Sequence, residues 1–171
     1  MKIRNGFVSN SSSSSFIVAF EKIPESISEL NEMLFGDSTI FQDPYEDKGY
    51  PSLEVSEVVF NDMKEGEISK ERAIEIISQG YFSGRQDFPF SELRSLYLDA
   101  EGNREKIKKI LDRENKEVKK AAKDLFINFS KNLKNKKLFY FSYGDNEGDF
   151  RCAMEHGNLF YKLPHITVSN H

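Results

Sequence analysis

Residues 9–20 read SNSSSSSFIVAF, and the five apolar residues that end this stretch, Phe16 to Phe20, decide the fold. A short, continuous apolar run rich in β-favouring residues is typical of a buried strand. Such a strand needs hydrogen-bonding neighbours, and the pattern predicts them in the C-terminal part of the chain. The sequence therefore predicts a sheet built from both ends of the chain.

From Leu138 onward the hydrophobic pattern has a period of two, which favours strands. The polar stretch at residues 144–149 predicts a hairpin loop, and Gly157-Asn158 predicts a two-residue turn. These signals together predict an antiparallel meander with strands at Leu138–Tyr143, Phe150–His156, Leu159–Leu163 and His165–His171.

Helical periodicity fills the middle of the chain. Ser26 and Glu29 have the spacing of a capping box, and the helix that they begin is expected to end near Gly36. Ser52 and Ser69 are predicted to cap two further helices, the second of which ends near Gly80. Residues 35–51, which contain Gly, Asp and Pro, are predicted to form a loop.

The longest helical signal runs from Asn103 to about Leu133, with a predicted break at residues 112–117. A strand, a block of helices and a meander indicate an α+β fold. We expect a single domain over residues 1–171, in which helices pack on one side of an antiparallel sheet.

The single cysteine, Cys152, excludes an internal disulfide and a thiolate zinc cluster. The basic start of the chain is followed by no apolar stretch as long as that of a signal peptide, and no run reaches the roughly 20 apolar residues of a membrane span. We therefore expect a cytoplasmic protein with no membrane contact. No motif identifies a cofactor or a metal.

The net charge of −4 conceals a segregation of charge along the chain. Residues 103–137 hold 13 Lys and Arg against 5 Asp and Glu, a net charge of +8. The remaining residues hold 11 basic against 23 acidic side chains, a net charge of −12. Segregation of this kind is typical of a chain that uses charge to contact a partner.

On a helical wheel, the basic residues of 103–137 lie opposite the apolar stripe and continue to Lys131 and Lys134. This face could bind phosphates or an acidic protein. It could also be a solvated face. Alternatively, its basic residues could pair with the acidic residues of the rest of the chain, within the fold or across a homo-oligomer. The candidate partner-binding residues are Lys106, Lys109, Arg113, Lys116, Lys120 and Lys123.

The serine run is the second candidate site. Serine favours turns and caps over helix interiors, so the run is predicted to form a loop before the first strand. Its N–H and O–H groups could converge on an anion, although the spacing of a P-loop is missing. The alternative is a flexible or solvated segment. The candidate anion-binding residues are Ser11, Ser12, Ser13, Ser14 and Ser15.

All three histidines lie in the last sixteen residues. In the predicted meander, His171 ends beside His156, while His165 lies too far from His171 to share a ligand with it. His156, His171 and Glu155 are therefore candidate catalytic residues, as a general base or as metal ligands. Structural or surface histidines are the alternative, and Glu155 is predicted to point away from His156.

Two loops have weaker signals. Residues 145–149 alternate oxygen-bearing side chains but lack EF-hand spacing, which favours a solvated hairpin loop over a calcium site. The aromatic stretch Tyr81–Phe90 is predicted to cover the core, with a partner-binding loop as the alternative.

Both ends of the chain resemble a known group of sequences. The opening, Arg4 to Asn10 followed by Ser11–Ser15 and Phe16, is similar to the start shared by many uncharacterised bacterial and phage proteins. The closing stretch resembles their ending in its segments 143–148 and 155–157, in His165 and in Ser169-Asn170-His171. The resemblance implies a bacterial or phage origin and a cytoplasmic setting, and it implies no activity.

Two functions follow as expectations, and a structural or assembly protein with a large apolar patch or an obligate dimer surface is a third possibility. The first is a small binding or regulatory protein whose basic helix engages an acidic protein or a nucleic acid. The second is an enzyme that acts on a phosphate-bearing substrate, which requires the serine run and a C-terminal histidine to converge in space.

Overall fold

A computed structural model of the chain describes residues 13–84, 94–96, 103–131, 133, 135–144 and 149–169. Its centre is a three-stranded sheet in the order β4-β1-β5. β1 (Ser13–Phe20) lies between β4 (Lys137–Gly144) and β5 (His165–Ser169) and is antiparallel to both, with Phe16 opposite Phe141 and Thr167. The predicted α+β class, with the N-terminal strand and C-terminal strands in one antiparallel sheet, is confirmed.

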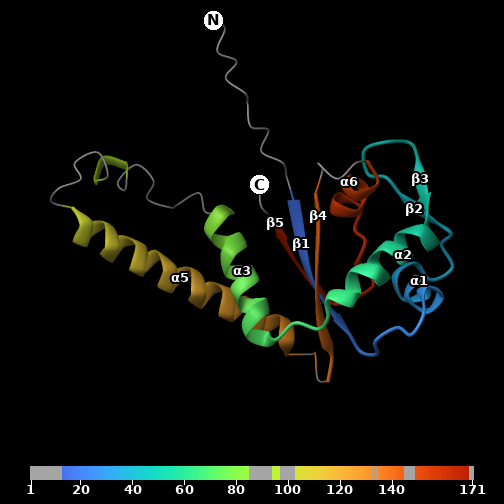
Figure 1. Ribbon diagram of the computed structural model, residues 1–171, viewed down its shortest axis with the longest axis horizontal. Helices are drawn as coiled ribbons and strands as arrows, with labels where there is room; N and C mark the ends of the chain where they lie inside the picture. Colours follow the sequence, from blue (N-terminus) through green and yellow to red (C-terminus); the bar gives the residue numbers. More distant parts are fainter. Residues whose placement is uncertain are drawn as a thin grey trace, which may run out of the picture.

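Helices cover both faces of this sheet, whereas the sequence predicted one side (Figure 1). The reason lies in β1, whose side chains are buried on both faces, as expected for a strand with a continuous apolar run. Phe16, Val18 and Phe20 belong to one hydrophobic cluster and Ile17 to the other.

The first face of the sheet carries α1 (Ile27–Phe35), α2 (Ser52–Asp62) with the 3₁₀ turn η1 (Met63–Glu65), and α6 (Asp149–His156). The segment between α1 and α2, predicted as a loop, contains the small hairpin of β2 (Ile40–Gln42) and β3 (Gly49–Pro51). This hairpin buries Phe41 against Phe35, which explains why a Gly- and Pro-rich stretch forms strands.

The second face carries α3 (Lys70–Gly84) and α5 (Arg104–Ser130). α5 is about 40 Å long, and its C-terminal half packs against α3 through residues such as Ala122 and Phe126. Its N-terminal half extends beyond the sheet, where Ile107 and Ile110 form a separate small cluster (Figure 1). α5 is therefore an arm held at one end.

The predicted break in α5 at residues 112–117 is wrong, because the helix is continuous through this stretch. The stretch contains no Gly or Pro, and its charged residues are good helix formers. α3 likewise continues past the predicted stop at Gly80 to Gly84. Ser69 caps α3 as predicted and accepts a hydrogen bond from the Arg72 N–H at 3.1 Å.

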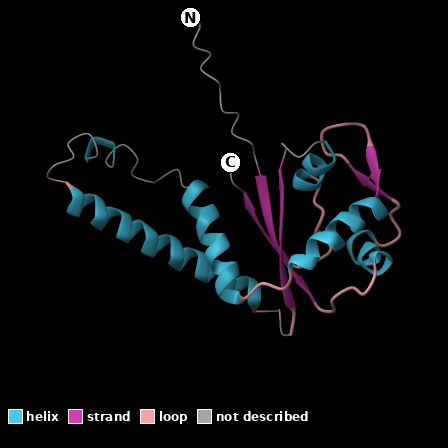
Figure 2. Ribbon diagram, viewed as in Figure 1, coloured by secondary structure: helices cyan, strands magenta, loops and turns pink. Residues whose placement is uncertain are grey.

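The predicted strand at Phe150–His156 is wrong, because this segment is α6. Ala153 and Met154 are buried and Phe150 packs beside them, which is helical spacing that a seven-residue window does not separate from alternation. Residues 159–163, also predicted as a strand, form turns between α6 and β5 (Figure 2). The predicted meander is thus replaced by strands that flank β1.

Among the residues that the structure describes, none of the helices combines the length and the apolar character that crossing a bilayer requires.

The predicted cap at the start of α1 forms, but the Glu29 side chain reaches Glu25, one residue before the N-cap Ser26 that a capping box would use. Ser26 Oγ accepts a hydrogen bond from the Glu29 N–H at 3.2 Å, and Glu29 Oε2 accepts one from the Glu25 N–H at 2.7 Å. The latter bond and the one from Lys22 Nζ lower the pKa of Glu29 below its ordinary value of 4.5. The carboxylate of Glu29 therefore stabilises the fold in its ionised form.

We expect Glu29→Gln to lower stability at neutral pH but not in acid. A carboxyl group whose pKa is lowered on folding contributes stability above its unfolded pKa, here about 4.5, and loses it as the pH falls through the folded value. Urea denaturation at neutral pH and at a pH below the folded value measures the difference. Ser26→Ala, which removes the N-cap hydrogen bond, should destabilise at both values. A Glu29→Gln effect of equal size at both would contradict this account.

Candidate functional site

The outer face of α5 carries all six of the predicted partner-binding residues. The opposite face of the helix is buried through Ile107, Ile110, Val118, Ala122 and Phe126. The six basic residues are all exposed, and their spacing of three or four places them in one row along the helix. They are Lys106, Lys109, Arg113, Lys116, Lys120 and Lys123.

Most of this basic row is unpaired. Arg113 donates hydrogen bonds to Glu114 Oε1 at 3.1 and 2.9 Å, and so compensates a buried carboxylate. The five lysines make no ion pair or hydrogen bond with any part of the chain that the structure describes. The ammonium groups of these lysines are therefore solvated, and the five side chains are available to a partner.

An apolar side chain interrupts this basic face near its C-terminal end. Ile127 is 39% exposed, and it lies one or two helical turns from Lys120, Lys123 and Lys131. Sequence reasoning missed Ile127, because it read the face by charge alone; the signal was an isoleucine outside the apolar stripe. Ile127 gives this face an apolar side chain that a protein partner would bury on binding.

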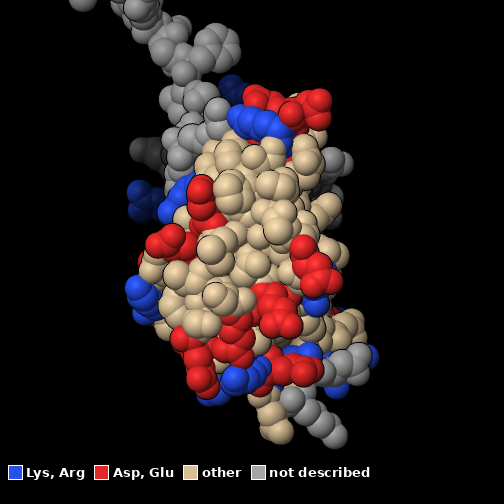
Figure 3. Space-filling view, turned by 90° about the vertical axis from the view of Figure 1, so that its right-hand side faces the viewer, with Lys and Arg blue, Asp and Glu red and all other residues tan. Residues whose placement is uncertain are grey.

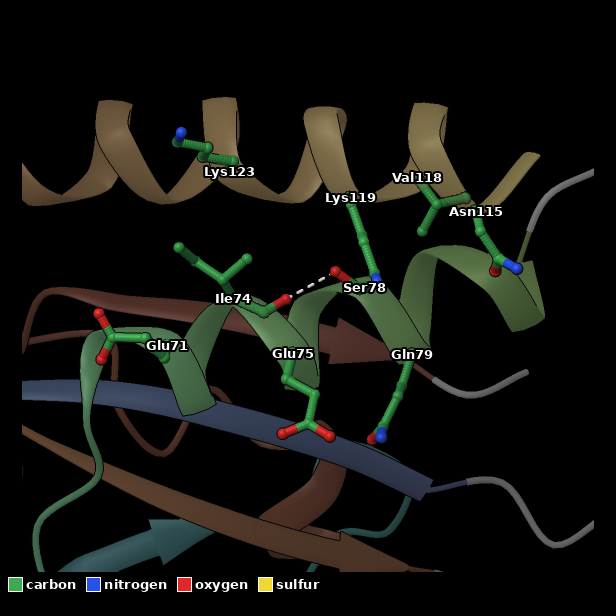
Figure 4. Close-up of a pocket in the computed structure, with 9 residues that line it drawn as sticks. All are labelled: Glu71, Ile74, Glu75, Ser78, Gln79, Asn115, Val118, Lys119 and Lys123. Atoms are coloured by element: carbon green, nitrogen blue, oxygen red, sulfur yellow. Dashed lines mark hydrogen bonds between the residues drawn. The ribbon is translucent and has the colours of Figure 1, made fainter. Parts of the chain in front are cut away.

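A groove of about 710 Å³ lies between α3 and α5 (Figure 4). Ile74 of α3 and Val118 of α5 supply its apolar lining, and Lys119 points from α5 toward α3. Glu75 and Gln79 point away from α5, and Glu75 is bonded to Arg72 at 2.7 Å. Because these polar side chains do not point toward a common position, the groove offers a ligand no set of converging polar groups.

The serine run contributes to the sheet instead of forming a loop. Ser13–Ser15 lie in β1, where Ser14 and Ser15 pair with both neighbouring strands, and Ser15 Oγ lies 3.0 Å from Tyr140 Oη. The loop expectation is therefore wrong for these three residues, because pairing with β4 and β5 takes up the main-chain groups that would face an anion. Ser11 and Ser12 lie outside the described residues.

Ser14 meets the C-terminal candidates at one end of the sheet. Its hydroxyl donates to Glu155 Oε1 at 3.5 Å, and Glu155 Oε2 lies 3.5 Å from His156 Nε2. The expectation that Glu155 points away from His156 is wrong, because both residues lie on a helix. His156 also contacts the Tyr45 ring edge to face, with centroids 5.1 Å apart.

The contact between Ser14 and Glu155 is closed to solvent, whereas the His156 side chain is 23% exposed. Ser14 and Glu155 are each only 4% exposed, and the Glu155 side chain alone is 0% exposed. Glu155 Oε2 has no hydrogen-bond partner among the described residues. A buried carboxylate repels an anion at this position. The Ser14–Glu155 contact is therefore a buried polar interaction at the end of the sheet and not an open anion site.

His165 does not join this cluster. His165 lies in β5, where Nδ1 is 2.9 Å from the Leu163 carbonyl oxygen, and its ring packs near Phe16 and Phe160. His171, residues 145–148 and residues 85–90 lie outside the described part of the chain, so the binding roles expected of them stay predictions. The hairpin expected around residues 144–149 is wrong, because the helix α6 begins at Asp149 where the second strand was expected. Within the described ranges, no group of three or more His, Cys, Asp or Glu side chains could hold a metal ion.

Gly157 fixes the end of α6 and so the place of His156. Its N–H donates to the Ala153 carbonyl at 2.8 Å, and a Cβ at this position would overlap that carbonyl oxygen and the Phe41 ring. We expect Gly157→Ala to lower the free energy of unfolding by about 1–3 kcal/mol, measured by urea denaturation.

A second background tests the cause of this cost. Phe41→Leu removes the ring atoms that the new methyl group would meet, so part of the Gly157→Ala penalty should disappear when both changes are combined. Strictly additive costs would contradict the proposed overlap.

The sequence matches no protein-family model and no curated protein, and the fold matches no solved structure. The activity of the chain is therefore inferred from the residues and geometry of its surface.

Proposed function

We propose that this chain is a small cytoplasmic binding protein of bacterial or phage origin that engages an acidic protein through the outer face of α5. The row of exposed, unpaired lysines on the arm carries the proposal. Lysines that answered only their own fold would be paired within it, as Lys136 and Lys137 are with Glu21 and Glu67. The resemblance at both chain ends supports the origin and the setting.

Two observations favour an acidic protein over a nucleic acid. Residues 21–67 hold 13 acidic against 3 basic side chains, a net charge of −10 that repels a phosphate backbone. The apolar residue within the basic face is Ile127, while single-stranded nucleic acid is bound by stacking on aromatic side chains. The arm therefore has the chemistry of a protein-docking helix.

Affinity capture with charge-reversed variants tests this function. Tagged wild-type protein and the variant Lys109→Glu, Arg113→Glu, Lys116→Glu, Lys120→Glu are isolated from the producing cells, with nuclease treatment as a second arm. We expect protein partners that the variant does not retain and that nuclease does not release. Equal capture by the variant, or partners lost with nuclease, would overturn the proposal.

The contact between Ser14 and Glu155 favours a second candidate, an enzyme that acts on a phosphate-bearing substrate with His156 as its base. This function requires Ser14 and Glu155 to become accessible to the substrate, because both residues are buried. Hydrolysis of p-nitrophenyl phosphate by the wild type, and its loss in Glu155→Gln and His156→Gln variants that still fold, would support this function. An inactive wild type would count against it.

A further inference from the structure

The helices that cover the face of the sheet opposite α5 carry negative charge on their outer surface, which is complementary to the basic row of α5. Figure 3 views the molecule from the side of α1 and α2, where acidic side chains lie around a broad uncharged surface. Six exposed carboxylates on this side make no ion pair with any described residue. They are Glu32, Asp37, Asp47, Glu54, Glu57 and Glu65.

α2 places an apolar residue among these carboxylates. Leu53 is 53% exposed, because it lies on the side of α2 opposite its buried neighbour Val55. Glu54 follows it directly and Glu57 lies one turn further on, both exposed. The outer face of α2 is therefore a leucine bordered by two unpaired acids.

The outer faces of α2 and α5 match one another in chemistry. On α5, Ile127 lies beside Lys120 and Lys123; on α2, Leu53 lies beside Glu54 and Glu57. Packing the two helices would bury both apolar side chains and pair lysines with glutamates. Complementary charge around an apolar contact is the pattern of a specific protein interface.

We propose that the acidic partner of α5 is a second copy of this chain, which offers α2. The inference rests on the proposed function and names its partner. α2 and α5 lie on opposite faces of the sheet, so one copy cannot close the contact on itself (Figure 1). The contact joins different surfaces of the two copies, and such contacts produce rings or open chains.

The association is expected to be weak and sensitive to salt. Exposed ion pairs each contribute little, and one helix-to-helix contact is smaller than a stable interface. We expect the weight-average mass to rise with concentration up to about 1 mM at low salt, and to return to the monomer mass at high salt.

Two variants that each remove one side of the contact test the inference by sedimentation. Lys116→Gln, Lys120→Gln, Lys123→Gln removes the basic side, and Glu54→Gln, Glu57→Gln removes the acidic side. Each variant alone should remain a monomer, while an equimolar mixture should form a heterodimer and stop there. The control Asp37→Asn, Glu65→Gln changes the same number of acidic charges away from α2 and should associate like the wild type.

The failures of the inference and of the proposed function are distinguishable. A wild type that is monomeric at every concentration, or a mixture that forms no heterodimer, would overturn the self-association. If the lysine-dependent capture of another protein persists in that case, the proposed function stands without it. A control variant that loses association equally would show a diffuse charge effect and would also overturn the α2 contact.

Discussion

Replacing Phe160 with alanine is expected to lower the free energy of unfolding by about 3–5 kcal/mol, the usual cost of removing a buried aromatic side chain. Phe160 is 1% exposed, and its ring centroid lies 4.9 Å from that of Phe141 in β4 and 5.3 Å from that of Phe16 in β1. The side chain holds the turn segment between α6 and β5 against two strands. Its loss should leave a cavity that the sheet cannot close.

The adjacent residue provides a matched control. Tyr161 is 63% exposed, so Tyr161→Ala should change the free energy of unfolding by less than about 0.5 kcal/mol. Both variants are compared with the wild type by urea denaturation. If the two substitutions cost similar amounts, the turn segment does not pack on the sheet as described.

Neutralising Lys109, Lys116, Lys120 and Lys123 to glutamine is expected to weaken binding to an acidic probe by about 4- to 900-fold. Each exposed ion pair contributes roughly 0.2–1 kcal/mol, and four such losses give this range. The probe is fluorescein-labelled poly-L-glutamate, with anisotropy as the readout. Stability should stay within about 0.5 kcal/mol of the wild type, since these lysines are exposed and unpaired among the described residues.

A control with the same change in net charge separates the α5 face from general electrostatics. Lys22, Lys64, Lys70 and Lys162 are also exposed but lie outside α5. Changing these four to glutamine should leave most of the affinity for poly-L-glutamate in place. An equal loss in both variants would mean that net charge, and not the row of lysines, binds the probe.

β1 and α5 could be predicted from the sequence because their signals are local. Five consecutive apolar residues specify a strand, and an apolar stripe over seven turns specifies a helix. The same run in β1 contained the information that both faces are covered, since Phe16 and Ile17 point to opposite sides and are both buried.

The sequence does not distinguish α6 from a strand, because the apolar residues of Phe150–His156 are too few to separate a period of two from a period of 3.6. Its position against β4 and β1 depends on tertiary packing of Ala153 and Met154. Because this segment is a helix, the observed sheet has β1 at its centre and is not the predicted meander.

The contact between Ser14 and Glu155 joins residues 141 positions apart, and no local pattern encodes it. The enzyme hypothesis requires the serine run to converge with the C-terminal candidates, but nothing in the sequence indicates that Ser14 and Glu155 are both buried. In contrast, the exposed basic row on α5 follows directly from helical spacing, which is why its six residues could be named from the sequence.

Site-specific photocrosslinking tests the binding role of α5 most directly. A photoreactive phenylalanine derivative is placed at Ile127 on the outer face of α5 or at Ile23, which is similarly exposed at 44% but lies before α1. We predict protein adducts from position 127 that disappear when Lys116, Lys120 and Lys123 are changed to glutamine, and no such adducts from position 23. Equal adducts at both positions, or adducts at position 127 that survive the lysine substitutions, would contradict the assignment of α5 as the binding surface.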